Sequence, residues 1–148
     1  MSDHVISPGL EHLPGTELPA GSFTVTPEDQ AQLAASLGRG AADGAHPVWA
    51  YIATQRGIGI SVADLCALAD FDVEDGPMLG SVDMTYSAPL ELGVEYRVTG
   101  EVVDIQRKHG RKAGTFDLMT FRERLLAPNG TEVASTTNTF ILPRREAT

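Results

Sequence analysis

The residues best suited to chemistry lie just before position 50. The segment Asp43-Gly44-Ala45-His46-Pro47 places an acid three positions before a histidine, with a proline directly after it. Because histidine titrates near neutral pH, His46 and Asp43 could act together as an acid–base pair. The alternatives are that His46 caps a helix and that Asp43 is a solvated loop acid, since Asp is common in turns. His46 and Asp43 are therefore the predicted catalytic residues, with these structural roles left open.

A second group of candidates is a basic run on an acidic chain. The sequence has 11 Lys and Arg residues against 20 Asp and Glu residues, which gives a formal net charge of −9. Within it, Arg107, Lys108, His109, Arg111 and Lys112 follow one another closely. An acidic protein that binds a phosphate-bearing ligand needs such a local basic patch. Arg107, Lys108, Arg111 and Lys112 are predicted to bind phosphate groups, and a solvated hairpin tip is the alternative.

Two further motifs are interpreted as structural. The run Arg56-Gly57-Ile58-Gly59-Ile60-Ser61 lacks the strand that precedes a phosphate-binding loop. Its glycines instead indicate a helix kink, or a close approach of two helices in a dimer. Trp49 and Tyr51 lie in an apolar stretch and are predicted to be core residues.

Polar residues near the C-terminus are also assigned to the surface. Asn138 lies among threonines, and a solvent face is favoured for it, with a pocket lining as the alternative. Of the three consecutive charges Arg122, Glu123 and Arg124, two are expected to face solvent and one to pair.

The composition of the chain limits the classes of protein to which it could belong. A chain of 148 residues that is 42% hydrophobic and 21% charged suits one folded domain. Its negative charge argues against nucleic acid and anionic membrane surfaces as partners. No apolar run approaches a membrane span, and Met1-Ser2-Asp3-His4 has no features of an export signal. The single Cys66 excludes an internal disulfide and a cysteine-pair metal site. We expect a soluble cytoplasmic protein without a bound metal.

Local patterns predict helices in the first half of the chain. Residues 1–22 are rich in Pro and Gly and are predicted to form an irregular arm or a short edge strand. Thr26-Pro27-Glu28-Asp29 is typical of a helix start, and that helix is expected to end near Leu37. Residues 47–69 are nearly all apolar and predict one long buried helix, with a break near 57–59 as an option.

The second half alternates apolar and polar residues, which is typical of strands. Strands are predicted over 81–86, 95–105 with a bulge at Gly100, 116–125 and 132–142, with a basic hairpin loop at 107–114. One buried helix beside an antiparallel sheet is an α+β architecture, with residues 23–148 as its single domain. Because such a sheet leaves a free edge, we expect an oligomer.

This order of elements resembles the hotdog fold, in which an antiparallel sheet wraps around a long central helix. Residues 76–145 resemble the MaoC-like hydratases and dehydratases. The likeness is carried by Tyr86-Ser87-Ala88-Pro89-Leu90-Glu91-Leu92-Gly93, by the following Val98-Thr99-Gly100-Glu101-Val102, and by the hairpin around Pro128-Asn129-Gly130. The resemblance implies a protein that acts on acyl thioesters, with coenzyme A as part of the substrate and no separate cofactor.

Active (R)-type hydratases of this family carry an Asp-x-Asn-Pro-x-His dyad segment and an Ala-His-Gly whose backbone N–H binds the thioester oxygen. Here Ala45-His46-Pro47 matches the second element, but Pro47 has no N–H. The resemblance leaves the amides of Val48 or Trp49 as substrate-binding donors. The dyad segment is missing, because only Gly38 to Ala45 separate the first helix from His46.

The resemblance therefore predicts the non-catalytic or atypical subunit of an enoyl-CoA hydratase or 3-hydroxyacyl dehydratase. Such a chain would form a homodimer, or a heteromer with a dyad-bearing hotdog homologue, and would suit a bulky acyl group such as a long-chain or steroid-like one. Two alternatives remain. One is a stand-alone hydratase or acyl-CoA thioesterase that uses His46 with Asp43 or water. The other is a non-enzymatic acyl-thioester binder.

Overall fold

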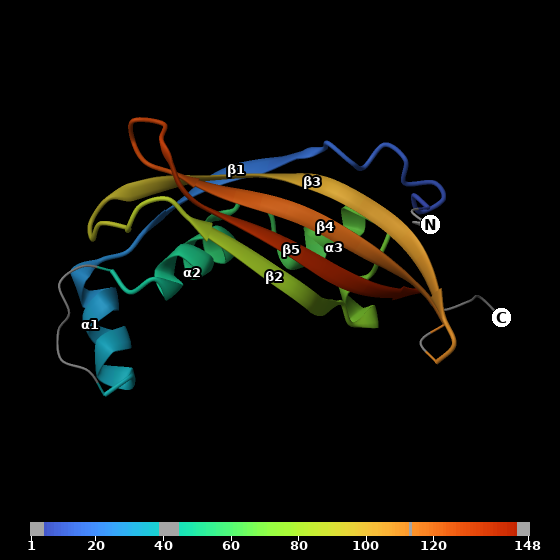
Figure 1. The fold of residues 1–148 in the computed structure, drawn as a ribbon, viewed down its shortest axis with the longest axis horizontal. Coiled ribbons are helices and arrows are strands. Elements are labelled where there is room, and N and C mark those ends of the chain that lie inside the picture. The colour runs from blue at the N-terminus through green and yellow to red at the C-terminus, as the bar shows by residue number, and fades with distance from the viewer. Residues whose placement is uncertain (1–4, 39–44, 113, 145–148) are drawn as a thin grey trace.

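The computed structural model describes residues 5–38, 45–112 and 114–144. Its main feature is one curved antiparallel sheet with two helices on the concave side (Figure 1). The strands follow the order β1-β3-β4-β5-β2 across the sheet, so β1 and β2 are its edges. Their bounds are β1 (Glu17–Thr24), β2 (Met78–Tyr86), β3 (Glu95–Gly110), β4 (Gly114–Leu126) and β5 (Glu132–Arg144). The predicted α+β architecture is confirmed.

Within the described part of the chain, three α-helices and one short 3₁₀ helix precede β2: α1 (Pro27–Ser36), α2 (Val48–Gly57), α3 (Val62–Leu68) and η1 (Val73–Asp75). The predicted start of α1 is confirmed by a capping box. The Asp29 amide donates to Thr26 Oγ1 at 3.0 Å, and the Thr26 amide donates to Asp29 Oδ2 at 3.1 Å. Helix α1 lies at one end of the sheet, whereas α2 and α3 lie under its concave face (Figure 1).

The long apolar segment is broken into α2 and α3, as the sequence allowed. Its glycines let the end of α2 approach β1 of the same chain rather than a second helix. A Cβ atom at Gly21 would lie 1.8 Å from the Gly57 carbonyl oxygen, and one at Gly59 would lie 2.5 Å from the carbonyl oxygen of Ala20. The Gly59 amide also donates to the Pro19 carbonyl at 2.9 Å. Backbone-to-backbone packing at this distance excludes larger residues.

The N-terminal segment contains an edge strand, which is one of the two options that the sequence predicted for it. Strand β1 runs through residue 22, where the arm was expected to end. Before it, the Ser7 amide donates to the Ile105 carbonyl at 3.3 Å, and the side chains of Leu10 and Leu13 are buried. Residues 5–16 therefore cover part of the sheet and belong to the hydrophobic core.

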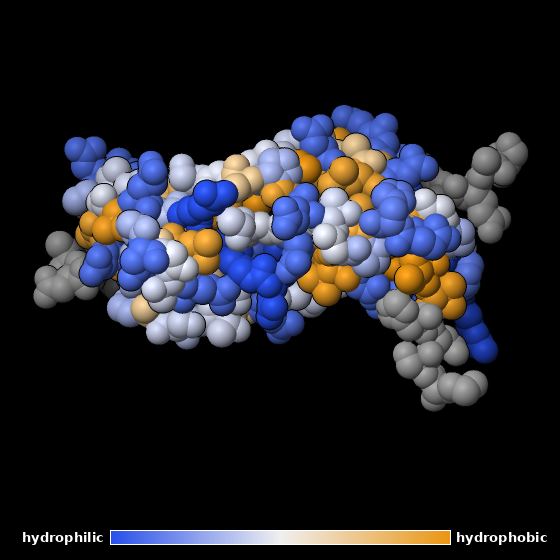
Figure 2. Space-filling view, turned by 90° about the horizontal axis from the view of Figure 1, so that it is seen from above, coloured by the Kyte–Doolittle hydropathy of each residue, from blue (hydrophilic) through white to orange (hydrophobic). Residues whose placement is uncertain are grey.

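Strand β3 is also longer than predicted. It continues through Gly110, so Arg107 and Lys108 pair with β4 instead of lying in a loop. The bulge predicted at Gly100 lies elsewhere, because the register shifts between Val102 and Asp104. Two buried clusters, one under α2 and one under α3, fill the space between the helices and the sheet. From above, hydrophilic and hydrophobic residues are interspersed over the surface (Figure 2).

Candidate functional site

The candidate site is built where α1 holds the first turn of α2. The buried Gln30 of α1 accepts two hydrogen bonds at its side-chain Oε1. One comes from the His46 amide at 2.8 Å and the other from the Trp49 indole Nε1 at 2.9 Å. This one amide group therefore fixes both the entry of the chain into α2 and the indole ring. Trp49 is buried, as predicted, and its ring lies 6.4 Å from that of Phe23.

The imidazole of His46 is fixed in one tautomer. Its Nδ1 accepts a hydrogen bond from the Val48 amide at 3.0 Å. A nitrogen that accepts carries no proton, so the neutral ring bears its proton on Nε2. Among the described residues, Nε2 of His46 has no hydrogen-bond partner, which leaves it available to a ligand. Nδ1 thus takes the capping role that the sequence left open, and a chemical role of His46 stays a prediction for Nε2.

The backbone amides of this turn are engaged within the chain. The Val48 amide is taken by the His46 ring, the Trp49 amide donates to the His46 carbonyl at 3.0 Å, and the Ala50 amide donates to the Pro47 carbonyl at 3.1 Å. Pro47 itself has no N–H. The sequence proposed Val48 or Trp49 as donors to a thioester oxygen. In this structure both donors already have partners, so this helix start offers no free amide to an oxyanion.

A groove of about 410 Å³ opens beside His46. Its walls are the segment before α2 and the segment that follows β2: Ala45, His46, Pro47, Tyr86, Ser87, Ala88, Pro89 and Leu90. The Tyr86 hydroxyl donates to the Pro47 carbonyl at 3.2 Å and ties the two walls together. The aromatic-x-x-Pro motif that carried the family resemblance therefore forms one wall of this groove. Asp43, the predicted partner of His46, lies outside the described residues.

The basic run lies at the opposite end of the sheet from His46, at the tip of the β3–β4 hairpin (Figure 1). Arg107 is engaged in the interior. Its Nε and Nη2 donate to the two carboxylate oxygens of Asp117 at 2.9 and 3.1 Å. Lys108 is half-buried, and Arg111 and Lys112 are exposed. The structure thus assigns Arg107 a structural ion pair in place of the predicted phosphate contact and leaves the other three basic side chains at the tip.

Asp117 receives a second cation from β5. Arg144 Nε donates to its Oδ2 at 2.8 Å, and the same guanidinium donates to the carbonyls of Ala69 and Asp70 after α3. Burial alone would raise the pKa of Asp117. The hydrogen bonds from Arg107 and Arg144 outweigh burial and hold its pKa below the usual value of 3.8. This ion cluster joins β3, β4, β5 and the segment after α3.

A buried polar cluster that the sequence analysis missed lies between α2 and the sheet. Glu123 is only 1% exposed, and its Oε1 accepts from Gln55 Nε2 at 3.0 Å and from Asn138 Nδ2 at 3.1 Å. Gln55 Nε2 also donates to Asn138 Oδ1 at 3.2 Å. Nearby, the hydroxyls of Thr54 and Thr136 are 3.0 Å apart.

This cluster corrects the prediction that Asn138 faces solvent. In the register of β4 and β5, Asn138 pairs with Phe121 and Thr136 pairs with Glu123, all on the face toward α2. The signal was present in the sequence, because Glu123 alternates with the buried Phe121 and Leu125. Arg122 is exposed, as expected for one of the three charges. Arg124 pairs with Glu101 at 2.8 Å and Glu132 at 3.2 Å.

The environment of Glu123 favours the protonated carboxyl group. Burial raises its pKa to about 8, although the hydrogen bonds from Asn138 and Gln55 lower it in part. No ion pair within the described residues includes Glu123. Near neutral pH this side chain is therefore a neutral carboxylic acid inside the domain.

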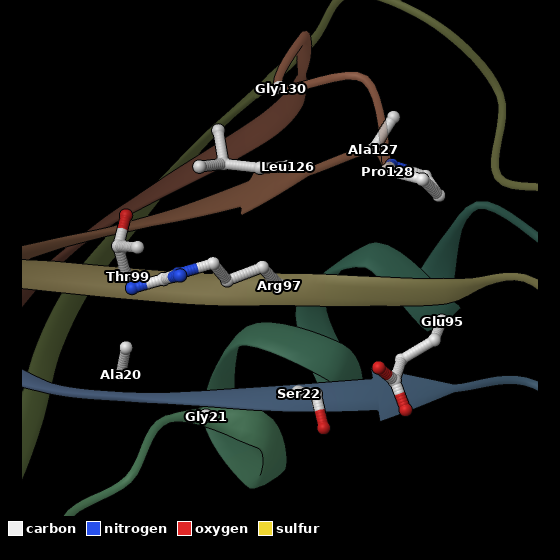
Figure 3. A pocket seen from close by; sticks show the side chains of 10 residues that line it. All are labelled: Ala20, Gly21, Ser22, Glu95, Arg97, Thr99, Leu126, Ala127, Pro128 and Gly130. Carbon is white, nitrogen blue, oxygen red and sulfur yellow. The ribbon is translucent and has the colours of Figure 1, made fainter.

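A second groove, on the outer face of the sheet, is larger but less specific. It measures about 1100 Å³ and is lined by β1, β3 and the hairpin after β4: Ala20, Gly21, Ser22, Glu95, Arg97, Thr99, Leu126, Ala127, Pro128 and Gly130. Its side chains do not converge on one point (Figure 3). Within the described part of the chain, no group of three or more His, Cys, Asp or Glu side chains could hold a metal ion. No helix there is long and apolar enough to span a membrane.

Comparison with known proteins identifies the fold. No protein-family profile and no curated protein matches the sequence. A chain of the ChsH1–ChsH2 complex from Mycobacterium tuberculosis is similar in structure, with a TM-score of 0.66 at 14% identity, over 88% of this chain and 84% of that one. A MaoC-like dehydratase from Rhodospirillum rubrum gives 0.59 at 16% identity, over 90% and 94%.

A chain of the M. tuberculosis HadBC (3R-hydroxyacyl-ACP dehydratase) complex gives a TM-score of 0.54 at 14% identity, over 87% of this chain and 96% of that one. These likenesses show that the chain is a hotdog-fold protein. The hotdog fold that the sequence predicted is therefore confirmed, and it is the fold of MaoC-like dehydratases.

Proposed function

We propose that this chain is an acyl-thioester-binding MaoC-like hotdog protein, and that it is the non-catalytic or atypical subunit of an enoyl-CoA hydratase or 3-hydroxyacyl dehydratase. The observation that carries this proposal is the first turn of α2. In the family that the chain resembles, this turn supplies the N–H that binds the thioester oxygen. Here Pro47 has no N–H, and the amides of Val48 and Trp49 are hydrogen-bonded within the chain.

The sequence before α2 supports the same role. Between Leu37 and His46 the only acid is Asp43, so the Asp-x-Asn-Pro-x-His dyad of active hydratases has no counterpart. A second chain that carries the dyad would then supply the acid–base chemistry. This chain would contribute the wall of the acyl site.

The free edge of β2 supports assembly with such a chain. Strand β2 pairs with β5 on one side only, and Met78, Leu79 and Tyr86 each expose about half of their surface. Antiparallel pairing with the edge of a second hotdog chain would satisfy the free backbone groups of β2. Two of the similar structures, ChsH1–ChsH2 and HadBC, are complexes of two named subunits.

Such pairing would also bring the basic hairpin of one chain close to the groove beside His46 of the other chain. A two-fold axis across β2 reverses the direction of the second sheet, so the hairpin end of one chain comes to the same end of the assembly as the α2 start of the other. Lys108, Arg111 and Lys112 of one chain would then face the carrier of a thioester held beside the partner's groove. Coenzyme A, with its phosphates, is the proposed carrier.

The test is to produce the chain alone and together with a dyad-bearing hotdog homologue encoded beside it. We expect a stable complex in light scattering and enoyl-CoA hydration that depends on the homologue's dyad. Substitution His46→Ala should reduce the turnover of that complex far less than loss of the homologue's dyad. A chain that remains a homodimer and hydrates enoyl-CoA unaided would overturn the proposed role.

One observation favours a second candidate, a stand-alone hydratase or thioesterase. The fixed tautomer of His46 leaves its Nε2–H free at the groove, where it could donate a hydrogen bond or a proton to a thioester. In that case the purified chain should hydrate enoyl-CoA or release a thiol, and His46→Ala should abolish the activity. Binding of acyl-CoA without turnover and without a catalytic partner would identify a non-enzymatic binder instead.

A further inference from the structure

The polar cluster of Glu123, Gln55 and Asn138 has hydrogen-bonding capacity that the chain does not use. Oε1 of Glu123 accepts from both amide side chains, so the proton of the neutral acid belongs on Oε2. Neither this Oε2 nor Oε1 of Gln55 has a hydrogen-bond partner among the described residues. The cluster therefore presents one free donor and one free acceptor, the pair that a hydroxyl group requires.

The cluster borders an uncovered part of the concave face. Tyr86 contacts the carbonyl before α2, so it lies on the helix side of β2, and Met84 and Val82 share that side by alternation. Met84 pairs with Thr136, and Val82 pairs with Asn138. Both side chains are only half-buried, because the helices do not fully cover β2. An apolar strip thus runs beside α2, with Gln55, itself half-buried, next to it.

The strip leads toward the groove at His46, because Tyr86, on the same side of β2 as Met84 and Val82, lines that groove. Val48 and Gln55 are seven positions apart in α2, which is about 10 Å along the helix axis. An acyl chain whose thioester lies beside His46 could extend along β2 and bring its distal part to Glu123. The cluster is too far from the thioester to act on it, so its role is recognition and not acid–base chemistry.

We propose that Glu123, Gln55 and Asn138 form a specificity site for a hydroxyl group carried on the distal part of the acyl chain. This proposal rests on the proposed acyl-thioester function and adds the class of acyl group. The Glu123 carboxyl donates to the hydroxyl oxygen and the Gln55 side chain accepts its proton. Asn138 positions both groups through its hydrogen bonds to them. An unsubstituted chain would leave the buried donor without an acceptor, which costs affinity.

The test compares two probes, stearoyl-CoA and a hydroxystearoyl-CoA with its hydroxyl in mid-chain. Their dissociation constants are measured by calorimetry on the full chain, with its partner where one co-purifies. We expect the hydroxylated probe to bind about tenfold more tightly, the gain from two neutral hydrogen bonds. Glu123→Gln retains a donor at the position of Oε2 and should keep the preference. Glu123→Met and Gln55→Leu should each reduce it.

Arg122→Met is the matched control, because Arg122 is the next residue on β4 and points to the exposed face. It should retain the preference in full. Thermal melts show whether each variant folds, and Gln55→Leu, at a half-buried position, changes the interior less than Glu123→Met does. Equal binding of both probes by the wild type, or a preference that survives in both Glu123→Met and Gln55→Leu, would overturn the specificity site alone. Failure of both probes to bind would overturn the proposed function as well.

Discussion

Two carboxyl groups on the same strand and the same face of the sheet have opposite protonation states. Asp117 and Glu123 both lie on β4, and both are almost completely buried. Asp117 is ionised because two guanidinium groups bond to it, whereas Glu123 is neutral because its partners are two uncharged amides. Both side chains are closed to solvent, but only Asp117 has cationic partners, and these partners favour its ionised form.

The same contrast divides the ends of the molecule. The end with α3 and the β3–β4 hairpin is held by the ions Arg107, Asp117 and Arg144. The end with α1 and the start of α2 is held by neutral hydrogen bonds from Gln30. The proposed site for a largely apolar acyl chain would benefit from the neutral arrangement, because a charged group beside such a chain would need its own solvation. The charged end serves to close the core under the N-terminal segment.

The largest loss of stability is expected from a substitution of Asp117, the charged one of the two buried carboxyl groups. Asp117→Asn leaves two guanidinium groups without their counter-ion inside the domain. The free energy of unfolding should fall by about 3–5 kcal/mol, the range for breaking a buried ion pair on one side. Urea denaturation followed by circular dichroism measures this.

The control for that substitution is Glu101→Gln, which breaks a pair with the partly exposed Arg124. Solvent screens such a pair, and its loss should cost no more than about 1 kcal/mol. An Asp117→Asn protein as stable as the Glu101→Gln protein would show that the ion cluster does not hold this end together.

The protonated Glu123 should make the free energy of unfolding depend on pH. In the unfolded chain Glu123 loses its proton near its ordinary pKa of 4.5, whereas the folded chain keeps it to about pH 8. Between these values the unfolded state binds fewer protons, so the free energy of unfolding falls as pH rises, by up to about 1.4 kcal/mol per pH unit. The contribution of Asp117 depends on pH in the opposite direction. Its lowered pKa stabilises the fold, and this stabilisation is lost as pH falls below about 3.8.

Glu123→Gln isolates the contribution of this carboxyl group, because the amide mimics the shape of the neutral acid. Its stability should lack the decline between pH 4.5 and 8, and at pH 9 it should exceed that of the wild type by about 2–4 kcal/mol. Parallel denaturation series from pH 5 to about pH 9 measure the difference. Identical pH profiles for the two proteins would contradict a buried neutral acid.

A smaller effect is expected at the neutral end. Gln30→Leu removes the acceptor shared by the His46 amide and the Trp49 indole, and it should destabilise the fold by about 1–3 kcal/mol. Because Trp49 is the only tryptophan, its fluorescence reports directly on the lost hydrogen bond. Gln32→Leu, two positions further along α1 and exposed, is the control and should leave the emission spectrum unchanged.

Much of the fold was predictable because its signals are local. The capping box at Thr26, the glycines after α2 and the alternation along β4 each depend on neighbouring residues. The length of β3 was not predictable in this way. A run of Lys and Arg is typical of a loop, but here it pairs with β4 through Gly110, and Arg107 also forms an ion pair with Asp117 across the hairpin.

The candidate site was predictable in position but not in chemistry. The resemblance placed His46 and Pro47 at the start of the central helix, where the structure has them. The engagement of the Val48 amide depends on the rotamer of the His46 ring, and the His46 amide is fixed by Gln30, 16 positions earlier. Likewise, Asn138 reaches Glu123 only through the register of two strands. Such contacts between distant positions leave no pattern in a single sequence.

The smallest effect on stability, and the clearest on binding, is expected at the hairpin tip. The exposed Arg111 and Lys112 make no ion pair with a described residue, so Arg111→Glu with Lys112→Glu should change the free energy of unfolding by less than about 0.5 kcal/mol. The same double variant should weaken acyl-CoA binding about tenfold, because two cations near the phosphates become anions, and this loss should shrink as salt is added.

Arg97→Glu with Arg122→Glu is the control of equal charge change, because both side chains are exposed and lie in no ion pair with a described residue. It should bind acyl-CoA like the wild type. Equal loss in both double variants would mean that net charge alone governs the affinity. Within one chain, the hairpin and the start of α2 lie at opposite ends of the sheet (Figure 1). If only the hairpin variant loses affinity, the carrier of the thioester must therefore contact two chains. The charged end of one subunit would then complete the neutral site of the other.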